Sequence, residues 1–196
     1  MRERRAAVGI ALLLRVAGGL AQLALLVTLA PNALADVRVV TTNPTLADLT
    51  RQVGGEQVRV ESLMRGPENT HNVIPKPSLV MKLRSADLFV QLGLDAEPWV
   101  PNLLRGARRE QLLPGGEGNV DVSRGIELLE VPSRTELTRA LGDIHVYGNT
   151  HYLLDPLNGI AIGRTIAAAL SRVDPDNASA FEEGARALEQ SLRALT

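Results

Sequence analysis

Apolar residues at strand-like and helix-like spacing predict a chain that alternates strands and helices from residue 36 onward. Residues 37–40 (Val-Arg-Val-Val) form a β-rich run, and Leu46, Leu49 and Val53 then recur at helical spacing. A second β-rich run at 58–61 completes a β-α-β unit. Such units build parallel sheets, because the crossover returns the next strand in the same direction. The sequence therefore predicts an α/β fold with a parallel sheet flanked by helices.

The same alternation continues to the end of the chain. Strands are predicted at 87–92 and 119–122, and helices near Ser78, at 97–104, from Asp155 to Ala169 and from about Asp174 onward. Asn43-Pro44 and Asp155-Pro156 each place a capping side chain before a proline, which is typical of a helix start. Ser78, after Pro77, is expected to cap its helix as well. The last helix has one apolar face, formed by Phe181, Ala185, Leu188, Leu192 and Leu195.

Composition and charge narrow the classes of protein. Hydrophobic residues make up 45% and charged residues 22% of the 196 positions, which is typical of a folded globular chain. The formal net charge of −1 gives no long-range attraction to nucleic acid or anionic lipid. The chain has no cysteine, which excludes disulfides, thiolate metal sites, a cysteine nucleophile and lipid attachment through cysteine. Metal ligands in this chain must therefore be His, Asp or Glu.

The N-terminal segment 1–35 has the features of a secretory signal peptide. Arginines cluster among the first five residues, an apolar stretch covers 16–30, and Ala-Leu-Ala at 33–35 resembles a cleavage site. The apolar stretch is shorter than the roughly 20 residues that cross a bilayer as a helix, so a permanent anchor is the weaker alternative. We expect cleavage after Ala35 and a periplasmic or otherwise extracytoplasmic mature chain.

A histidine lies in each of two polar loops. Residues 65–72 follow the second predicted strand and contain His71, and residues 147–152 contain His151. In open α/β sheets, ligands bind in the crevice outside the carboxyl ends of the strands. The position of His71 therefore makes it a candidate for ligand binding.

Four segments carry a resemblance to a known family. They are residues 39–49 (Val-Val-Thr-Thr-Asn-Pro-Thr-Leu-Ala-Asp-Leu), the His71 loop with Pro75-Lys76-Pro77-Ser78, residues 85–89 (Ser-Ala-Asp-Leu-Phe) and residues 149–156 (Asn-Thr-His-Tyr-Leu-Leu-Asp-Pro). One histidine precedes a Pro-x-Pro-Ser helix start, and another precedes an Asp-Pro helix start. With these segments in this order, the chain resembles the periplasmic zinc- and manganese-binding proteins of ABC importers.

The resemblance implies the N-terminal lobe of a two-lobed metal-binding protein. In this family a long helix joins the lobes, and the metal lies between them, held by two histidines of the first lobe and usually two ligands of the second. His71 and His151 match the first-lobe pair. The expected organisation is a signal peptide at 1–35, a metal-binding lobe at 36–172 and the start of the connecting helix at 173–196, with the second lobe absent.

The function that the resemblance implies is extracytoplasmic capture of a divalent metal ion for delivery to the permease of an ABC importer. Zinc is favoured over manganese, although the chain lacks the long loop rich in His and Asp that many zinc-specific members insert. A closed tetrahedral zinc site takes four protein ligands, so two histidines are an incomplete site. A missing second lobe or self-association would complete it. Because imidazole binds metal only when deprotonated, affinity is expected to fall as the pH drops through about 6.5.

Other residues near these loops have two interpretations each. His145 is either a third metal ligand or a structural histidine. Asp155 is either a helix cap or a residue that orients a metal ligand. Glu68 is expected to be solvated, and Trp99 is expected to pack in the core.

Three competing functions give different expectations. An enzyme is not predicted, because the chain has no His-Glu-x-x-His pair, no Gly-x-Ser-x-Gly elbow and no phosphate-binding glycine loop. A surface adhesion or interaction module would bind its partner even without both histidines. A truncated copy of a metal carrier would bind no metal.

Overall fold

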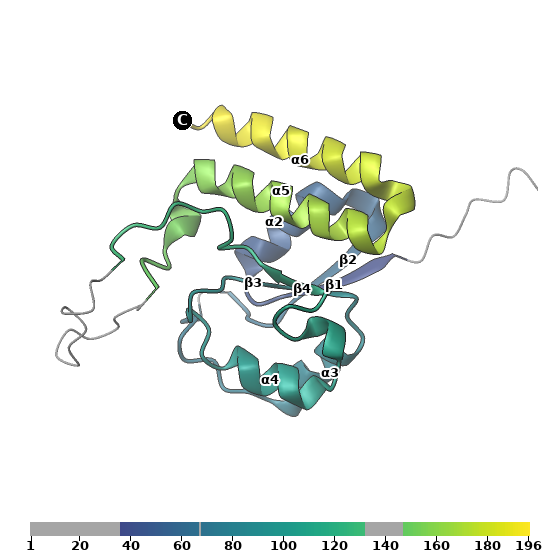
Figure 1. Ribbon diagram of the computed structural model, residues 1–196, viewed down its shortest axis with the longest axis vertical. Helices are drawn as coiled ribbons and strands as arrows, with labels where there is room; N and C mark the ends of the chain where they lie inside the picture. Colours follow the sequence, from purple (N-terminus) through teal and green to yellow (C-terminus); the bar gives the residue numbers. More distant parts are fainter. Residues whose placement is uncertain (1–35, 67, 132–146) are drawn as a thin grey trace, which may run out of the picture. The chain divides into compact units, whose positions relative to one another are not determined.

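A parallel β-sheet lies at the centre of the fold (Figure 1), which a computed structural model describes for residues 36–66, 68–131 and 147–196. In these ranges the strands are β1 (Val37–Thr41), β2 (Val58–Ser62), β3 (Leu88–Gln91) and β4 (Asn119–Asp121), in the spatial order β2-β1-β3-β4. Each neighbouring pair is parallel, and the register aligns Val39 with Val60 and Val40 with Phe89. The predicted parallel α/β fold is confirmed.

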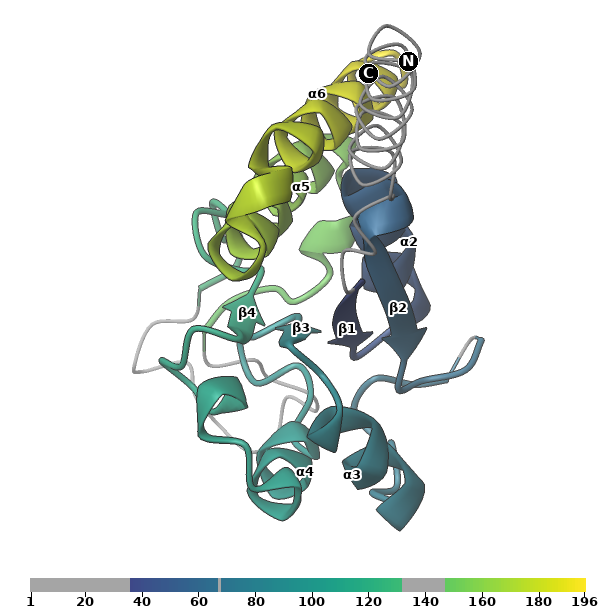
Figure 2. The same ribbon diagram turned by 90° about the vertical axis from the view of Figure 1, so that its right-hand side faces the viewer.

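Helices cover both faces of this sheet (Figures 1 and 2). On one face lie α2 (Pro44–Gly54), α5 (Pro156–Val173) and α6 (Ala178–Arg193); on the other lie α3 (Pro77–Arg84) and α4 (Val100–Ala107). Short 3-10 helices are η1 (Gly55–Gln57), η2 (Glu110–Leu112), η4 (Tyr152–Leu154) and η5 (Pro175–Asn177). The result is a three-layer arrangement of helices, sheet and helices.

The side chains of successive strand residues point into two separate cores. Val39 and Val90 pack with α2, α5 and α6, whereas Val40 and Phe89 pack with α3 and α4. This division follows from the period of two along a strand. Full burial of an aliphatic side chain stabilises the folded state by about 1.5–3 kcal/mol, so both layers stabilise the sheet.

The helix starts confirm two of the three predicted caps. The side-chain oxygen of Asn43 accepts a hydrogen bond from the backbone N–H of Leu46 at 3.0 Å. Asp155 does the same for Leu157 at 2.8 Å. The prediction for Ser78 is wrong, because Pro77 is the first residue of α3 and Lys76 therefore occupies the capping position, without a side-chain bond. The helix predicted at 97–104 runs instead from Val100 to Ala107.

Helices α5 and α6 pack closely as an antiparallel pair. A Cβ on Gly159 would lie 2.8 Å from the side chain of Leu192, and one on Gly163 would lie 2.7 Å from that of Leu188. Of the predicted apolar face, Phe181, Ala185 and Leu188 are buried, whereas Leu195 is 74% exposed, so the buried part of the face ends before it. That residues 173–196 begin an inter-lobe helix remains a prediction.

The described residues from 36 onward form one compact unit. In the part of the chain that the structure describes, no helix combines the length and the apolar character needed to cross a membrane. The predicted signal peptide at 1–35 lies outside this part, and so does His145.

Candidate metal-binding site

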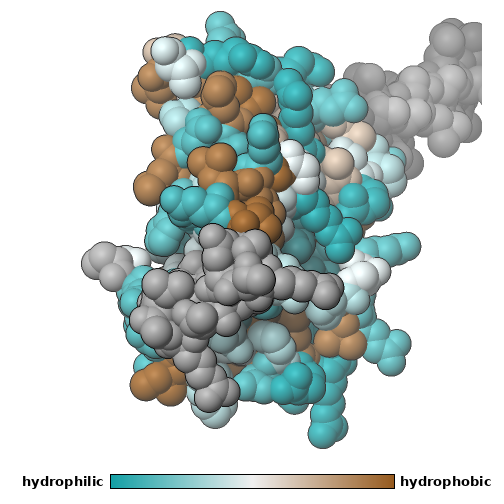
Figure 3. All heavy atoms as spheres, turned by 60° about the vertical axis from the view of Figure 1, so that its left-hand side comes forward, coloured by the Kyte–Doolittle hydropathy of each residue, from teal (hydrophilic) through white to brown (hydrophobic). Residues whose placement is uncertain are grey.

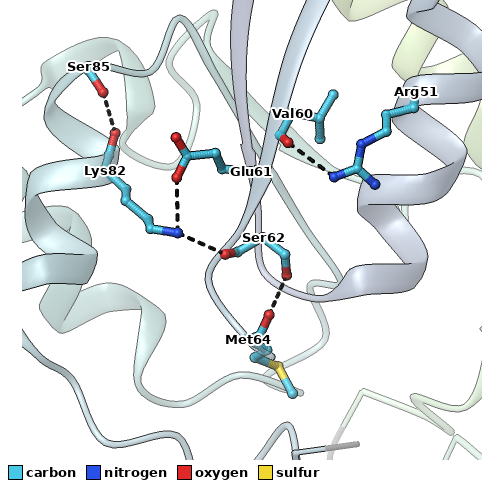
Figure 4. Close-up of polar contacts among 7 residues, drawn as sticks. All are labelled: Arg51, Val60, Glu61, Ser62, Met64, Lys82 and Ser85. Atoms are coloured by element: carbon cyan, nitrogen blue, oxygen red, sulfur yellow. Dashed lines mark hydrogen bonds and ion pairs between the residues drawn. The ribbon is translucent and has the colours of Figure 1, made fainter. Parts of the chain in front are cut away.

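The loop that carries His71 starts at the carboxyl end of strand β2, where polar contacts fix it (Figure 4). The hydroxyl of Ser62 donates to the carbonyl of Met64 at 2.8 Å. From helix α3, the ammonium group of Lys82 contacts the carboxylate of Glu61 at 2.9 Å and donates to the carbonyl of Ser62 at 3.3 Å. The strand that precedes the loop and the helix that follows it are thereby joined.

His71 lies in a turn that two further residues hold. Its backbone N–H donates to the side-chain oxygen of Asn69 at 2.9 Å. The indole N–H of Trp99 donates to the carbonyl of Thr70 at 2.6 Å. Trp99 is only 4% exposed, which agrees with its predicted packing role. A buried, rigid side chain thus fixes the residue next to His71.

Asn149 orients His151. Its side-chain oxygen lies 2.9 Å from both the backbone N and the ring Nδ1 of His151. Its side-chain NH₂ donates to the carboxylate of Glu130 at 2.7 Å, so the oxygen must face the imidazole. Because that oxygen only accepts, Nδ1 is the donor in this hydrogen bond, and in the neutral imidazole Nε2 then keeps a lone pair. This is the arrangement that a metal-ligating histidine needs.

Tyr152, the residue after His151, joins this second loop to the residue that follows strand β3. Its hydroxyl donates to the carbonyl of Leu92 at 2.5 Å, and the side chain is buried. Burial raises the pKa of Tyr152, and the negative charges of Glu97 and Asp121 raise it further. The hydroxyl therefore stays protonated and available as a donor.

Glu97 is a buried carboxyl group between the two histidine loops in the sequence. It is 5% exposed, and its Oε2 accepts a hydrogen bond from the backbone N–H of Leu92 at 2.9 Å. Burial raises the pKa of Glu97 from 4.5 to about 7, although the bond from Leu92 favours the ionised form. Glu97 thus changes charge near neutral pH.

Both histidine loops are hydrogen-bonded to the connection that leaves the carboxyl end of β3. Leu92 follows β3 directly and is bonded to Tyr152, while Trp99, a few residues later, is bonded to Thr70. The neighbours of His71 and His151 are therefore held by the same connection between β3 and α4. In a doubly wound sheet, this edge is where ligands bind.

Asp155 and Glu68, the acidic residues considered near the two histidine loops, form hydrogen bonds to the backbone. Asp155 caps α5, and exposed Glu68 accepts a hydrogen bond from the backbone N–H of Arg65 at 2.6 Å. Within the described ranges, no three His, Cys, Asp or Glu side chains gather into a group that could hold a metal ion. The histidines contribute two candidate ligands, and a complete site needs more.

The tripeptide Asn-Thr-His occurs twice, at 69–71 and at 149–151, and both copies form the same turn. This repeat is a sequence signal that could have identified Asn69 and Asn149 as partners of the histidines. No comparable signal marks Glu97 or the hydroxyl of Tyr152, because their bonds depend on the fold.

An open hollow of about 610 Å³ lies beside His151. Leu129, Leu154 and Leu157 line it together with polar residues such as Asn158. Leu154 is 83% exposed. Figure 3, which brings forward the side of Figure 1 on which α5 begins and α6 ends, shows apolar side chains at the surface among polar ones. The surroundings of His151 are therefore partly apolar.

Comparison with known proteins decides the family. The family model ZnuA, zinc-uptake complex component A, periplasmic, matches residues 39–196. The chain belongs to this family. The ZnuA family consists of substrate-binding proteins of ABC transporters and not of enzymes, as predicted.

Curated relatives and solved structures agree with the ZnuA family. The metal ABC transporter substrate-binding lipoprotein SsaB of Streptococcus sanguinis is 28% identical over 163 residues, which are 81% of this chain and 49% of SsaB. The manganese ABC transporter substrate-binding lipoprotein ScaA of Streptococcus gordonii is 27% identical, with the same coverage. A zinc-bound ZnuA deletion mutant has a TM-score of 0.67 and 27% identity over 81% of this chain and 55% of that structure. Zinc-bound AdcA from Streptococcus pneumoniae has a TM-score of 0.65 and 27% identity over 82% and 31%.

The chain spans about half the length of the curated relatives that it matches. The matched half has the α/β fold with the parallel sheet, as expected from the sequence. The names of these relatives mention manganese in one case and zinc in another, so the metal differs among proteins that this chain resembles.

Proposed function

We propose that this chain captures a divalent metal ion outside the cytoplasm for an ABC importer, and that His71 and His151 are two of the metal ligands. The observation that carries the proposal is the contact of Asn149 with Nδ1 of His151, which leaves Nε2 as a ligand atom. The hydrogen bonds that bring both histidine loops to one sheet edge support it.

Zinc is the favoured cargo, and manganese is the alternative. Imidazole nitrogen suits zinc, whereas manganese prefers carboxylate, carbonyl and water oxygens. The solved ZnuA and AdcA structures are described as zinc-bound, whereas ScaA is described as a manganese protein. The remaining ligands of a tetrahedral set come, in this proposal, from a second lobe or a second copy.

Competitive zinc titration against a chromophoric chelator tests the proposal. The chain has three histidines, so His71→Ala, His151→Ala and His145→Ala form a complete set. We expect zinc binding to weaken at least tenfold in the first two variants, which remove a direct ligand, and to stay unchanged in the third. Equal binding by the unmodified chain, His71→Ala and His151→Ala would contradict the proposed ligands.

The same titration with manganese tests the choice of metal. Tighter binding of manganese than of zinc at equal pH would overturn the preference for zinc while leaving the two ligands in place. Binding of neither metal by the unmodified chain would contradict metal capture by these residues alone.

A further inference from the structure

The connection between β3 and α4, residues 92–99, contacts the neighbours of both histidines. At its end, Trp99 donates to the carbonyl of Thr70 at 2.6 Å. At its start, the carbonyl of Leu92 accepts a hydrogen bond of 2.5 Å from the hydroxyl of Tyr152. The carboxylate of Glu97 accepts from the N–H of Leu92 at 2.9 Å and thereby closes residues 92–97 into a loop that leads directly to Trp99.

The backbone of this connection has an uncommon conformation. Gly93, Leu94 and Asp95 have φ angles of 74°, 55° and 56°. For residues other than glycine, the left-handed region costs roughly 1–2 kcal/mol each. A Cβ on Gly93 would lie 2.1 Å from the carboxylate of Asp121. Such a turn persists only where surrounding bonds fix it, and here the bond between Glu97 and Leu92 closes it.

We propose that residues 92–99 fix the separation of the two histidine loops, with Trp99, Glu97 and Tyr152 as positioning residues for metal capture. This inference rests on the proposed function, since it assumes that both histidines bind the ion.

The demands of metal coordination explain the need for such an element. Ligand distances in metal sites vary by only about 0.2 Å, so the two imidazoles must be held at a defined separation. They are far apart in the sequence and lie in loops that follow different strands. Residues 92–99 are bonded next to both of them, so one rigid segment sets the position of each loop relative to the other. Neither Trp99 nor Tyr152 needs to touch the ion.

Zinc titration of the full chain with Tyr152→Phe, Trp99→Phe and both changes tests this inference. Tyr152→Phe removes only the hydroxyl, and Trp99→Phe removes the indole donor while keeping an aromatic ring. We expect each single change to lower zinc affinity about tenfold, as loss of a ligand-orienting contact does. The zinc affinity of the double variant should be only slightly lower than that of the weaker-binding single variant, because either change alone already frees residues 92–99. Tyr147→Phe, at the chain's other tyrosine, which is 54% exposed, should bind as the unmodified chain does.

Two results would overturn the proposal. The first is unchanged affinity in both single variants while the unmodified chain binds zinc. The second is a double variant whose fold-loss of zinc affinity equals the product of the two single fold-losses, which would show that the two contacts act independently.

A metal-free measurement separates this inference from the proposed function. Trp99 is the only tryptophan in the chain, so its fluorescence reports on this segment alone. Tyr152→Phe should make Trp99 more accessible to quenching by acrylamide than it is in the unmodified chain or in Tyr147→Phe. Equal quenching in all three proteins refutes the coupling, even if the unmodified chain binds no zinc or Trp99→Phe does not fold.

Discussion

The carboxylate of Glu97 accepts a hydrogen bond of 2.9 Å from the backbone N–H of Leu92, and both residues are buried. The side chain closes a left-handed turn, but the same burial opposes its ionisation and raises its pKa to about 7. The negative charge of Asp121 adds to this effect. The carboxyl group that holds the turn is therefore also a source of pH-dependent stability.

The free energy of unfolding should depend on pH through Glu97. Between pH 4.5 and about 7, the folded chain keeps a proton that the unfolded chain has released. Stability contributed by this group is thus present at low pH and falls by about 1.4 kcal/mol per pH unit across that window. Glu97→Gln is neutral at every pH, so it should remove this slope and be more stable than the unmodified chain above pH 7.

Urea unfolding from pH 4.5 to 8 measures this effect. Glu56→Gln, at an exposed position in η1, is the matched control and should keep the original slope. Comparison with the control cancels contributions that the two variants share. Identical slopes for Glu97→Gln and Glu56→Gln would show that Glu97 ionises normally in the folded state.

Asn149→Ala should weaken metal binding without unfolding the protein. The change removes the acceptor of the Nδ1 proton of His151, so the ring loses its fixed tautomer and orientation. We expect zinc affinity to fall about tenfold. Asn72→Ala, in the exposed part of the His71 loop, is the control and should bind normally. Chelator competition measures the zinc affinity of both variants, and thermal unfolding shows whether they are folded. Normal zinc affinity in Asn149→Ala would contradict the assignment of His151 as a ligand through Nε2.

Asp155→Ala should lower stability through the lost helix cap. Its Oδ1 accepts from the N–H of Leu157 at 2.8 Å, and loss of such a cap costs about 1 kcal/mol. Asp155→Asn keeps the acceptor and should be nearly as stable as the unmodified chain. If Asp155 is only a cap, zinc affinity stays the same in both variants, so a loss of affinity in Asp155→Asn would reveal a role in orienting the metal ligands.

Gly184→Ala should disturb the packing of α6 on α2. A Cβ at this position would lie 2.2 Å from the backbone carbonyl oxygen of Val53, which cannot move as a flexible side chain does. We expect a loss of about 2 kcal/mol or more in the free energy of unfolding. Gly106→Ala, in α4, is the matched control: its Cβ would be 3.3 Å from the side chain of Val80, and the better helix propensity of alanine offsets the contact. Equal unfolding midpoints for the two variants would refute the close approach.

Local signals predicted the fold well, and long-range contacts limited the prediction of the site. The caps at Asn43 and Asp155 depend on residues two or three positions away, so the sequence contains the whole signal. Ser78 was misassigned because proline can occupy the first helical position and thereby moves the cap to Lys76, whose side chain cannot accept a hydrogen bond.

Both histidine loops were recognised from their polar composition and from the family resemblance, but their anchors were not. Trp99 bonds to Thr70 across 29 positions, and Tyr152 bonds to Leu92 across 60. No periodicity in the sequence encodes such pairs, because they exist only once the sheet has formed. Trp99 was correctly expected to be buried, since a large aromatic side chain is usually inside, but its N–H had no predictable acceptor.

Strand β2 lies at one edge of the sheet that the structure describes. The guanidinium group of Arg51 donates to the backbone carbonyl of Val60 on this strand at 3.1 Å (Figure 4), and the flanking side chains of Arg59 and Glu61 are exposed and charged. A strand from a neighbouring molecule would need that carbonyl and would have to accommodate both charges. This edge is thereby protected against intermolecular sheet formation, because a strand from a second molecule would have to displace the bond of Arg51 and accommodate both charges.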